Sequence, residues 1–335
     1  MRAWGQRASR LPPHSARLPA QLMLPAFSVI FLTTLIGLGQ GLFLALYTVE
    51  LGAAFELAAP QDGRAFFALG AVLALAFLAA GLVASFFHLG RPERAWRAAA
   101  MWRTSWLARE VIVLPAFMAA VFGYGAAHYL GLPATLATGA IASVLCLALF
   151  LCTGMIYACI KFLQEWATPL TVVNYLLLGC ASGFVFATLL AAATGSDLAG
   201  ALGAGAVMLS LAAWITRGAA LVRNRRLKPR STLQSAIGIK HPRIAQKAQG
   251  FMGGSFNTRE FFHRRGRQSM SLVKWSFIVL VFPVPAALIV AGAALASVPL
   301  LAAAFVAQYL GLIAERWFFF AQANHPQNLY YQAIS

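Results

Sequence analysis

The stretch WSFIVLVFPVPAALIVAGAALASVPLLAAAFVAQYLGLIA, residues 275–314, decides the fold class of this chain. It contains 40 residues without a single acidic or basic side chain. A helix needs about 20 apolar residues to cross the hydrocarbon core of a bilayer, so one helix of this length would be far too long. We therefore expect a break near Ser297-Val298-Pro299, with one membrane-spanning helix on each side of it.

The rest of the 335-residue chain repeats this pattern of long uncharged segments separated by clusters of charge. Charged residues make up 10% of the chain, whereas a soluble domain has about 25%. Backbone groups in lipid must form their hydrogen bonds within the segment, which leaves helices as the structure of each one. The sequence predicts an all-α membrane domain at residues 23–320, a bundle of eight transmembrane helices. These are expected at 25–47, 65–87, 106–130, 134–160, 168–193, 198–217, 273–295 and 299–320.

The distribution of Lys and Arg predicts how these helices are oriented. When the connecting segments are assigned alternately to the two membrane faces, one face holds 25 of the 26 basic residues and the other only Arg64. Basic segments stay in the cytoplasm, so we expect both termini there, as tails at 1–22 and 321–335 that flank an uncleaved bundle. The long loop 222–272 carries twelve basic residues and is expected on the same side. It either touches anionic lipid headgroups or docks a partner subunit.

Several classes of function are disfavoured by the same observations. The net charge of +17 is explained by the flanks of membrane helices and does not require nucleic acid as a partner. The four cysteines form no C-x-x-C pair, so the ligand set of a zinc site or an iron–sulfur cluster is missing. A membrane haem needs axial ligands inside the bundle, and the two candidates, His88 and His128, are predicted at opposite faces. We expect no metal or tightly bound cofactor in this chain.

Ionisable side chains near the hydrocarbon are costly, and each is therefore a candidate for function. These residues are His88, Arg91, Arg94, Arg109, Glu110, His128, Arg217, Glu315 and Arg316. Most of them gather at the predicted cytoplasmic face. Reduction of a quinone consumes two protons, and a histidine or a partly buried carboxylate can exchange them. His88 and Glu110 supply that pair, Arg94 would orient either one, and aromatic residues such as Trp106 would form walls for the ring.

Each of these features also has a purely structural explanation. A histidine at a helix end caps carbonyl groups, an Arg-rich loop marks topology, and a glutamate beside an arginine forms an ion pair. Glycines such as Gly37, Gly39 and Gly41 let helices pack closely. From the residues alone, a quinone-binding redox subunit, a membrane transporter and a purely structural anchor without a quinone site all stay open. Transport is disfavoured because the middles of the spans carry almost no charge.

Two segments resemble a known family. They are SFFHLGRPERAW at 85–96 and SWLARE at 105–110, and both are similar to the DmsC family, the membrane anchor subunits of dimethyl sulfoxide reductase-type molybdoenzymes. The family pattern is an H-L-G-x-P-x-R-A stretch followed by a Ser- and Glu-containing helix start. MIYA at 155–158, with Trp166, Thr168 and Pro169, and AER at 314–316 also resemble the family. The resemblance extends over residues 25–320 in hydropathy and order.

The resemblance implies an anchor with eight spans in the bacterial inner membrane that holds no cofactor of its own. Such an anchor binds a molybdopterin catalytic subunit and a four-cluster, ferredoxin-like iron–sulfur subunit, and exchanges electrons with quinone or quinol in anaerobic electron transport. The family's site residues match His88, Arg94 and Glu110 in this chain. Supporting roles then fall to nearby residues, namely Arg91, Arg109, Trp106, Glu315 and Arg316.

The loop 222–272 is long and basic relative to the family pattern. Together with the cytoplasmic placement of His88, it is similar to the anchors of cytoplasm-facing sulfite dehydrogenases within this family. That similarity implies electron flow toward quinone, and partner subunits on the cytoplasmic face.

Overall fold

The structure is a computed structural model that describes residues 27–56, 63–87, 89, 91–228, 230–244 and 267–323. Within these ranges the regular structure is helical, without a strand. The helices are α1 (Phe27–Ala54), α2 (Arg64–Phe86), η1 (Pro92–Met101), α3 (Trp106–Leu130), α4 (Thr135–Ala158), α5 (Pro169–Ala193), α6 (Ala199–Arg225), α7 (Leu233–Ile237), α8 (Arg267–Val281), α9 (Pro283–Ala294) and α10 (Val298–Ala321).

Eight helical segments in the described residues are long and apolar enough to cross a membrane, and α8 and α9 together form the seventh. The all-α architecture with eight spans is thereby confirmed. The break expected near Ser297 is also confirmed, because α9 ends at Ala294 and α10 begins at Val298 with Pro299 in its first turn. Proline suits that position because it has no N–H to leave unbonded.

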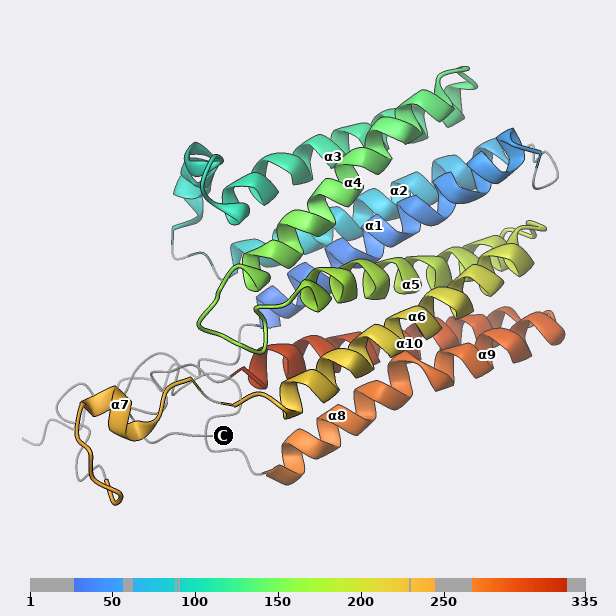
Figure 1. Cartoon of the computed structure of the whole chain (residues 1–335). Coiled ribbons are helices and arrows are strands. Elements are labelled where there is room, and N and C mark those ends of the chain that lie inside the picture. Colours follow the sequence, from blue (N-terminus) through green and yellow to red (C-terminus); the bar gives the residue numbers. More distant parts are fainter. Residues whose placement is uncertain are drawn as a thin grey trace, which may run out of the picture.

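The spans lie side by side in one bundle with their long axes roughly aligned (Figure 1). Helix α1 packs against α2, α4, α5 and α10, and α5 packs against α1, α4, α6 and α10. These two helices therefore form the centre of the bundle. They approach so closely that a Cβ atom on Gly183 would overlap the carbonyl carbon of Gly41. Glycine is required at this contact, as the small-residue pattern of the sequence predicts.

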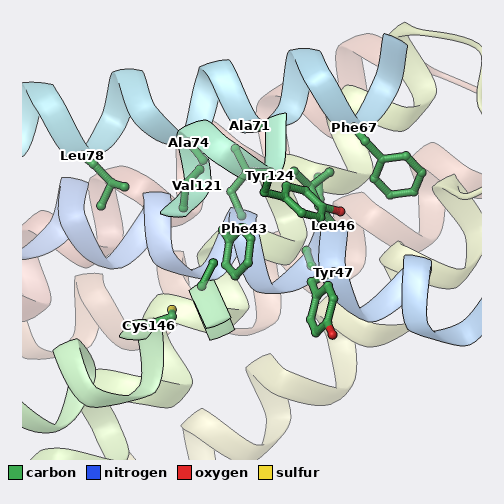
Figure 2. Close-up of a cluster of buried hydrophobic side chains, with 14 of the residues drawn as sticks. Phe43, Leu46, Tyr47, Phe67, Ala71, Ala74, Leu78, Val121, Tyr124 and Cys146 are labelled. Carbon is green, nitrogen blue, oxygen red and sulfur yellow. The ribbon is translucent and has the colours of Figure 1, made fainter. Parts of the chain in front are cut away.

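The largest apolar core joins side chains of α1 to α4 with others from α5 and α6. Part of it, with Phe43 and Tyr124, is drawn in Figure 2. The Phe43 ring meets the edges of Phe117 and Tyr124 at centroid distances of 5.5 and 5.4 Å, and all three side chains are fully buried. Lipid tails are as apolar as these side chains, so burying the side chains between helices brings no hydrophobic gain. Close van der Waals packing between the helices therefore supplies much of the stability. The core also forms an apolar layer between the two ends of the bundle.

Three helices extend beyond the ranges that hydropathy gave, and the first of them is α1, which was predicted to end at residue 47 and continues to Ala54. Helix α6 continues to Arg225, and α8 already begins at Arg267, so both ends of the predicted loop 222–272 are helical. A further short helix, α7, lies inside this segment, whereas residues 245–266 fall outside the described ranges. A helix can continue into water beyond the hydrocarbon, where basic side chains are solvated, and hydropathy cannot detect that extension.

Candidate functional site

The site is built at the end of the bundle where α1 begins and α10 finishes (Figure 1). There α2 is followed by η1, and α3 begins after Ser105, whose hydroxyl accepts a hydrogen bond from the backbone N–H of Ala108. Such a cap satisfies an N–H that the helix leaves unpaired. Arg109 fixes the same corner, because its guanidinium donates to the carbonyls of Trp102 and Arg103, each at 2.9 Å.

Glu110 follows this corner and lies in the interior of the bundle, with 8% of its surface exposed. Its Oε1 accepts a hydrogen bond from the hydroxyl of Thr153 on α4. Among the described residues, no cation lies within ion-pair distance of this carboxyl group. A buried carboxyl group with a neutral partner is costly in its charged form, and it is suited to gaining and losing a proton.

Glu110 lines a narrow pocket between α1, α3, α4, α5 and α10. Arg316 on α10 lines the same pocket, together with apolar side chains such as Phe150 and polar ones such as Gln40 and Ser182. The cavity has a volume of about 20 Å³, enough for about one water molecule. A ring-shaped ligand would therefore have to displace some of the lining side chains as it enters.

Arg316 belongs to a buried cluster of three charges. Oε2 of Glu315 lies 3.1 Å from Nε of Arg316, and Oε1 lies 2.7 Å from Nε of Arg217 on α6. The exposed fractions are 2% for Arg217, 1% for Glu315 and 4% for Arg316. Two arginines thus share one carboxylate in an interior where unpaired charge is expensive.

Aromatic rings also contact the Arg316 guanidinium. Its Cζ lies 3.8 Å from the ring centroid of Tyr175, a cation–π contact, and Tyr157 stacks on Tyr175 at 5.6 Å. Trp166 stacks on Phe319 at 5.3 Å and donates its indole N–H to the Phe319 carbonyl at 2.9 Å. These contacts join the loop between α4 and α5 to the end of α10 and hold Arg316 in place.

The structure brings only part of the predicted set of residues together. Glu110 and Arg316 line one pocket, and Glu315 pairs with Arg316. Arg91 and Arg94 are exposed; Arg94 lies on η1, with Glu93 at 3.9 Å, and neither residue lines the pocket. His88 lies outside the described residues.

The remaining two supporting residues belong to the corner before Glu110. Trp106 is half-buried and carries the Arg109 guanidinium 4.2 Å from the centroid of its ring. Arg109 therefore acts on the backbone of this corner, and within the described residues neither side chain lines the pocket.

Sequence reasoning gave no site role to three residues that the structure places here. Arg217 was recognised as an ionisable residue near the hydrocarbon, but its pairing with Glu315 depends on how α6 packs. Thr153 and Tyr175 carry no signal in the sequence, because neutral residues of these types are common in membrane helices. Their roles become visible only through contacts between helices.

A second pair of ionisable residues lies at the opposite end of the same helices. Nε2 of His128, in the last turn of α3, lies 3.4 Å from Oε1 of Glu50 on α1. The His128 ring stacks on Phe67 at 4.6 Å and meets the edge of Tyr124 at 4.6 Å. His128 and Glu50 also line a separate pocket of about 190 Å³.

Known proteins are similar to this chain over a range of sequence that includes the pocket residues. A family model described as DMSO reductase anchor subunit (DmsC) matches residues 22–322, a range that contains every residue of the pocket described above. A curated relative, the C subunit of sulfite dehydrogenase from Allochromatium vinosum, is 53% identical over 326 residues, which cover 93% of this chain and 100% of the relative. The resemblance found in the segments 85–96 and 105–110 is confirmed: the chain belongs to the DmsC family of DMSO reductase anchor subunits.

Proposed function

We propose that this membrane anchor binds quinone in the pocket between Glu110 and Arg316 and passes electrons to it from an iron–sulfur partner subunit. One observation carries the proposal: a buried carboxyl group, with no cationic partner among the described residues, faces a pocket that an arginine also lines. Membership of the anchor family supports the association with a molybdoenzyme catalytic subunit. The relative's printed name supports sulfite as the electron donor of the whole complex.

The pocket has the groups that quinone reduction requires. Reduction to quinol takes two electrons and two protons, and Glu110 can deliver a proton directly to a quinone oxygen held beside it. The Arg316 guanidinium can donate hydrogen bonds to such an oxygen, and the Phe150 and Tyr175 rings provide flat apolar walls. His88 is proposed as a second proton donor from the sequence resemblance, whereas Arg94, whose side chain is exposed and does not line the pocket, is given no part in the proposed proton transfer.

The partner subunits are proposed to dock at the end of the bundle that carries this pocket. The Lys and Arg bias of the connecting segments supports a cytoplasmic location for that end. Electrons from an iron–sulfur subunit docked there would have only a short distance to travel to the pocket. The basic residues of α6 and of the segment after it, among them Arg225, Arg226 and Lys228, lie at the same end and offer positive charge to a partner.

The test uses Glu110→Gln in the complete complex, with Glu93→Gln as the matched control. Gln keeps the shape of the side chain and its contact with Thr153 but cannot release a proton, whereas Glu93 is an exposed carboxylate on η1. We expect Glu110→Gln to lower sulfite-dependent reduction of a short-chain quinone about 100-fold, the scale of general acid–base catalysis. Reduction of a soluble one-electron acceptor, which bypasses the pocket, should not change.

The control variant should keep both activities. Quinone reduction at the original rate in Glu110→Gln would remove this residue from the mechanism and leave a structural anchor. Loss of both activities would show failed assembly, and the amount of each partner in the purified complex would reveal it. His88→Gln, measured in the same two assays, tests whether the sequence resemblance identified a second proton donor.

A further inference from the structure

We infer that the pocket binds its quinoid ligand as an anion, with the cluster Arg217–Glu315–Arg316 supplying the compensating positive charge; the inference rests on the proposed quinone site. The cluster is nearly inaccessible to solvent, and its one carboxylate is engaged on both oxygens, one by each arginine. The three side chains therefore leave one positive charge uncompensated at the wall of the pocket.

An uncompensated charge of this kind is expensive inside a membrane protein. Removing an ion from water costs several kcal/mol unless an opposite charge accompanies it. Among the described residues that line the pocket, Glu110 is the one acidic side chain. The pocket is thus electrically balanced in two ways, either with Glu110 as a carboxylate or with Glu110 protonated and an anion bound.

Aromatic contacts hold the positive charge where it is. Arg316 contacts both Glu315 and the Tyr175 ring, and the Phe319 ring on the same helix lies 5.4 Å from its Cζ. A guanidinium held in this way does not have to reorganise when negative charge develops beside it. Such fixed charges stabilise developing anions more than mobile ones do.

This balance assigns an order to the steps of quinone reduction. With neutral quinone bound, Glu110 is a carboxylate. The first electron from the iron–sulfur partner converts quinone to the semiquinone anion, which pairs with the cluster while Glu110 takes up a proton from the aqueous side. The Glu110 proton then moves to a semiquinone oxygen and leaves a carboxylate, so the pocket still holds one negative charge. A second electron and a second proton from the aqueous side complete the quinol, with Glu110 again a carboxylate.

The test compares two probes that differ in charge and little in shape. A 2-hydroxy-3-alkyl-1,4-naphthoquinone is an anion at neutral pH, whereas its 2-methoxy ether is neutral. Equilibrium binding of each is measured with the complete complex in lipid nanodiscs, in the oxidised state and without turnover. We expect the wild-type complex to bind the hydroxy compound at least tenfold more tightly than the ether.

Glu110→Gln gives the decisive result, because it should act in opposite directions on binding and on turnover. Without the competing carboxylate, the variant should bind the anionic probe several-fold more tightly and the ether as before, although its quinone reduction is lost. An unchanged or weaker preference for the anion in this variant would overturn the inference. If the wild-type complex binds the two probes equally, the inference fails while the quinone site stands, and if it binds neither, the proposed quinone site itself fails.

The role of the cluster's positive charge is tested directly with Arg316→Met and Arg316→Lys. Met removes the charge, so the preference for the anion should fall at least tenfold, and Lys restores the charge and should restore most of the preference. The amount of bound partner is measured first, since a buried arginine can matter for assembly. If Arg316→Met does not assemble, the Glu110→Gln measurement decides the question, because Gln preserves the contact with Thr153.

Discussion

The two ends of the α1–α4 bundle each bury a glutamate beside a pocket, but among the described residues only one of these carboxylates has a basic partner. Glu50 pairs with His128 at 3.4 Å, and their side chains are 11% and 9% exposed. Glu110 has the neutral hydroxyl of Thr153 instead. Cavity size does not identify Glu110 as the functional candidate, because the pocket beside Glu50 is the larger of the two. The difference in charge pairing fits a structural role for Glu50, which links α1 to α3, and fits the proton exchange proposed for Glu110.

The apolar core keeps these two ends electrically separate. Phe43 on α1 packs against Tyr124 on α3 (Figure 2) and also against Phe117 on α3, and these rings carry no charge that could link Glu50 with Glu110. A change at one end should therefore have little effect on the chemistry at the other. Matched variants at Glu50 and Glu110, and at their partners, test this separation.

The largest expected effect is on quinone reduction. Glu110→Gln should lower it about 100-fold, while Glu50→Gln should leave it within about twofold of the original rate, because general acid–base catalysis acts only on groups beside the reacting atoms. Initial rates with a short-chain quinone and sulfite measure both. A comparable loss in Glu50→Gln would mean that protons reach the quinone through the whole length of the bundle, and the separation of the two ends would be wrong.

The next largest effect is on stability. Here a variant at the Glu50 end should have a larger effect on the free energy of unfolding than a variant at the Glu110 end. His128→Leu leaves the largely buried Glu50 carboxylate without its nearest basic side chain, so it should lower the free energy of unfolding by about 3 kcal/mol. Thr153→Val removes a neutral partner of Glu110 and should cost about 1 kcal/mol. Thermal unfolding of the purified complex in one detergent ranks the two variants. Equal losses would show that Glu110 depends on its partner as strongly as Glu50 does.

The fold could be predicted from the sequence because membrane spans are recognised from consecutive residues, by their hydropathy and their lack of charge. Uncharged runs gave each span, and Pro299 marked the start of α10. The division of the seventh span at Phe282 was missed, although Pro283 follows it directly. The extension of α6 to Arg225 was missed because hydropathy detects hydrocarbon contact and not helix.

Of the residues that line or support the candidate pocket, only the charged ones could be singled out from the sequence. Glu110 and Arg316 were recognisable because ionisable residues are rare near the hydrocarbon. Thr153 and Tyr175 could not be recognised, since their roles arise from contacts between helices that are distant in sequence, such as the hydrogen bond between α4 and α3. Arg217 was noticed, but only the contact between its side chain on α6 and Glu315 on α10 shows that the two residues form an ion pair.

The smallest effect is expected at Arg94, which the sequence resemblance placed beside His88 and Glu110. In the structure its side chain is 51% exposed on η1 and meets Glu93 at 3.9 Å. An exposed pair at this distance contributes less than about 1 kcal/mol, so Arg94→Gln should not change thermal unfolding measurably. Because the side chain does not line the pocket, the KM for quinone should rise less than threefold with kcat unchanged.

Arg109→Gln is the matched comparison for Arg94→Gln, because the Arg109 guanidinium donates two hydrogen bonds that fix the corner before Glu110. It should reduce quinone turnover several-fold by displacing the start of α3, with a smaller effect on binding of the neutral naphthoquinone ether. If Arg94→Gln instead abolishes quinone reduction as Glu110→Gln does, the partner subunit must press η1 onto the pocket in the assembled complex. The functional end of the bundle would then be completed by docking, whereas the Glu50–His128 end is complete within this chain.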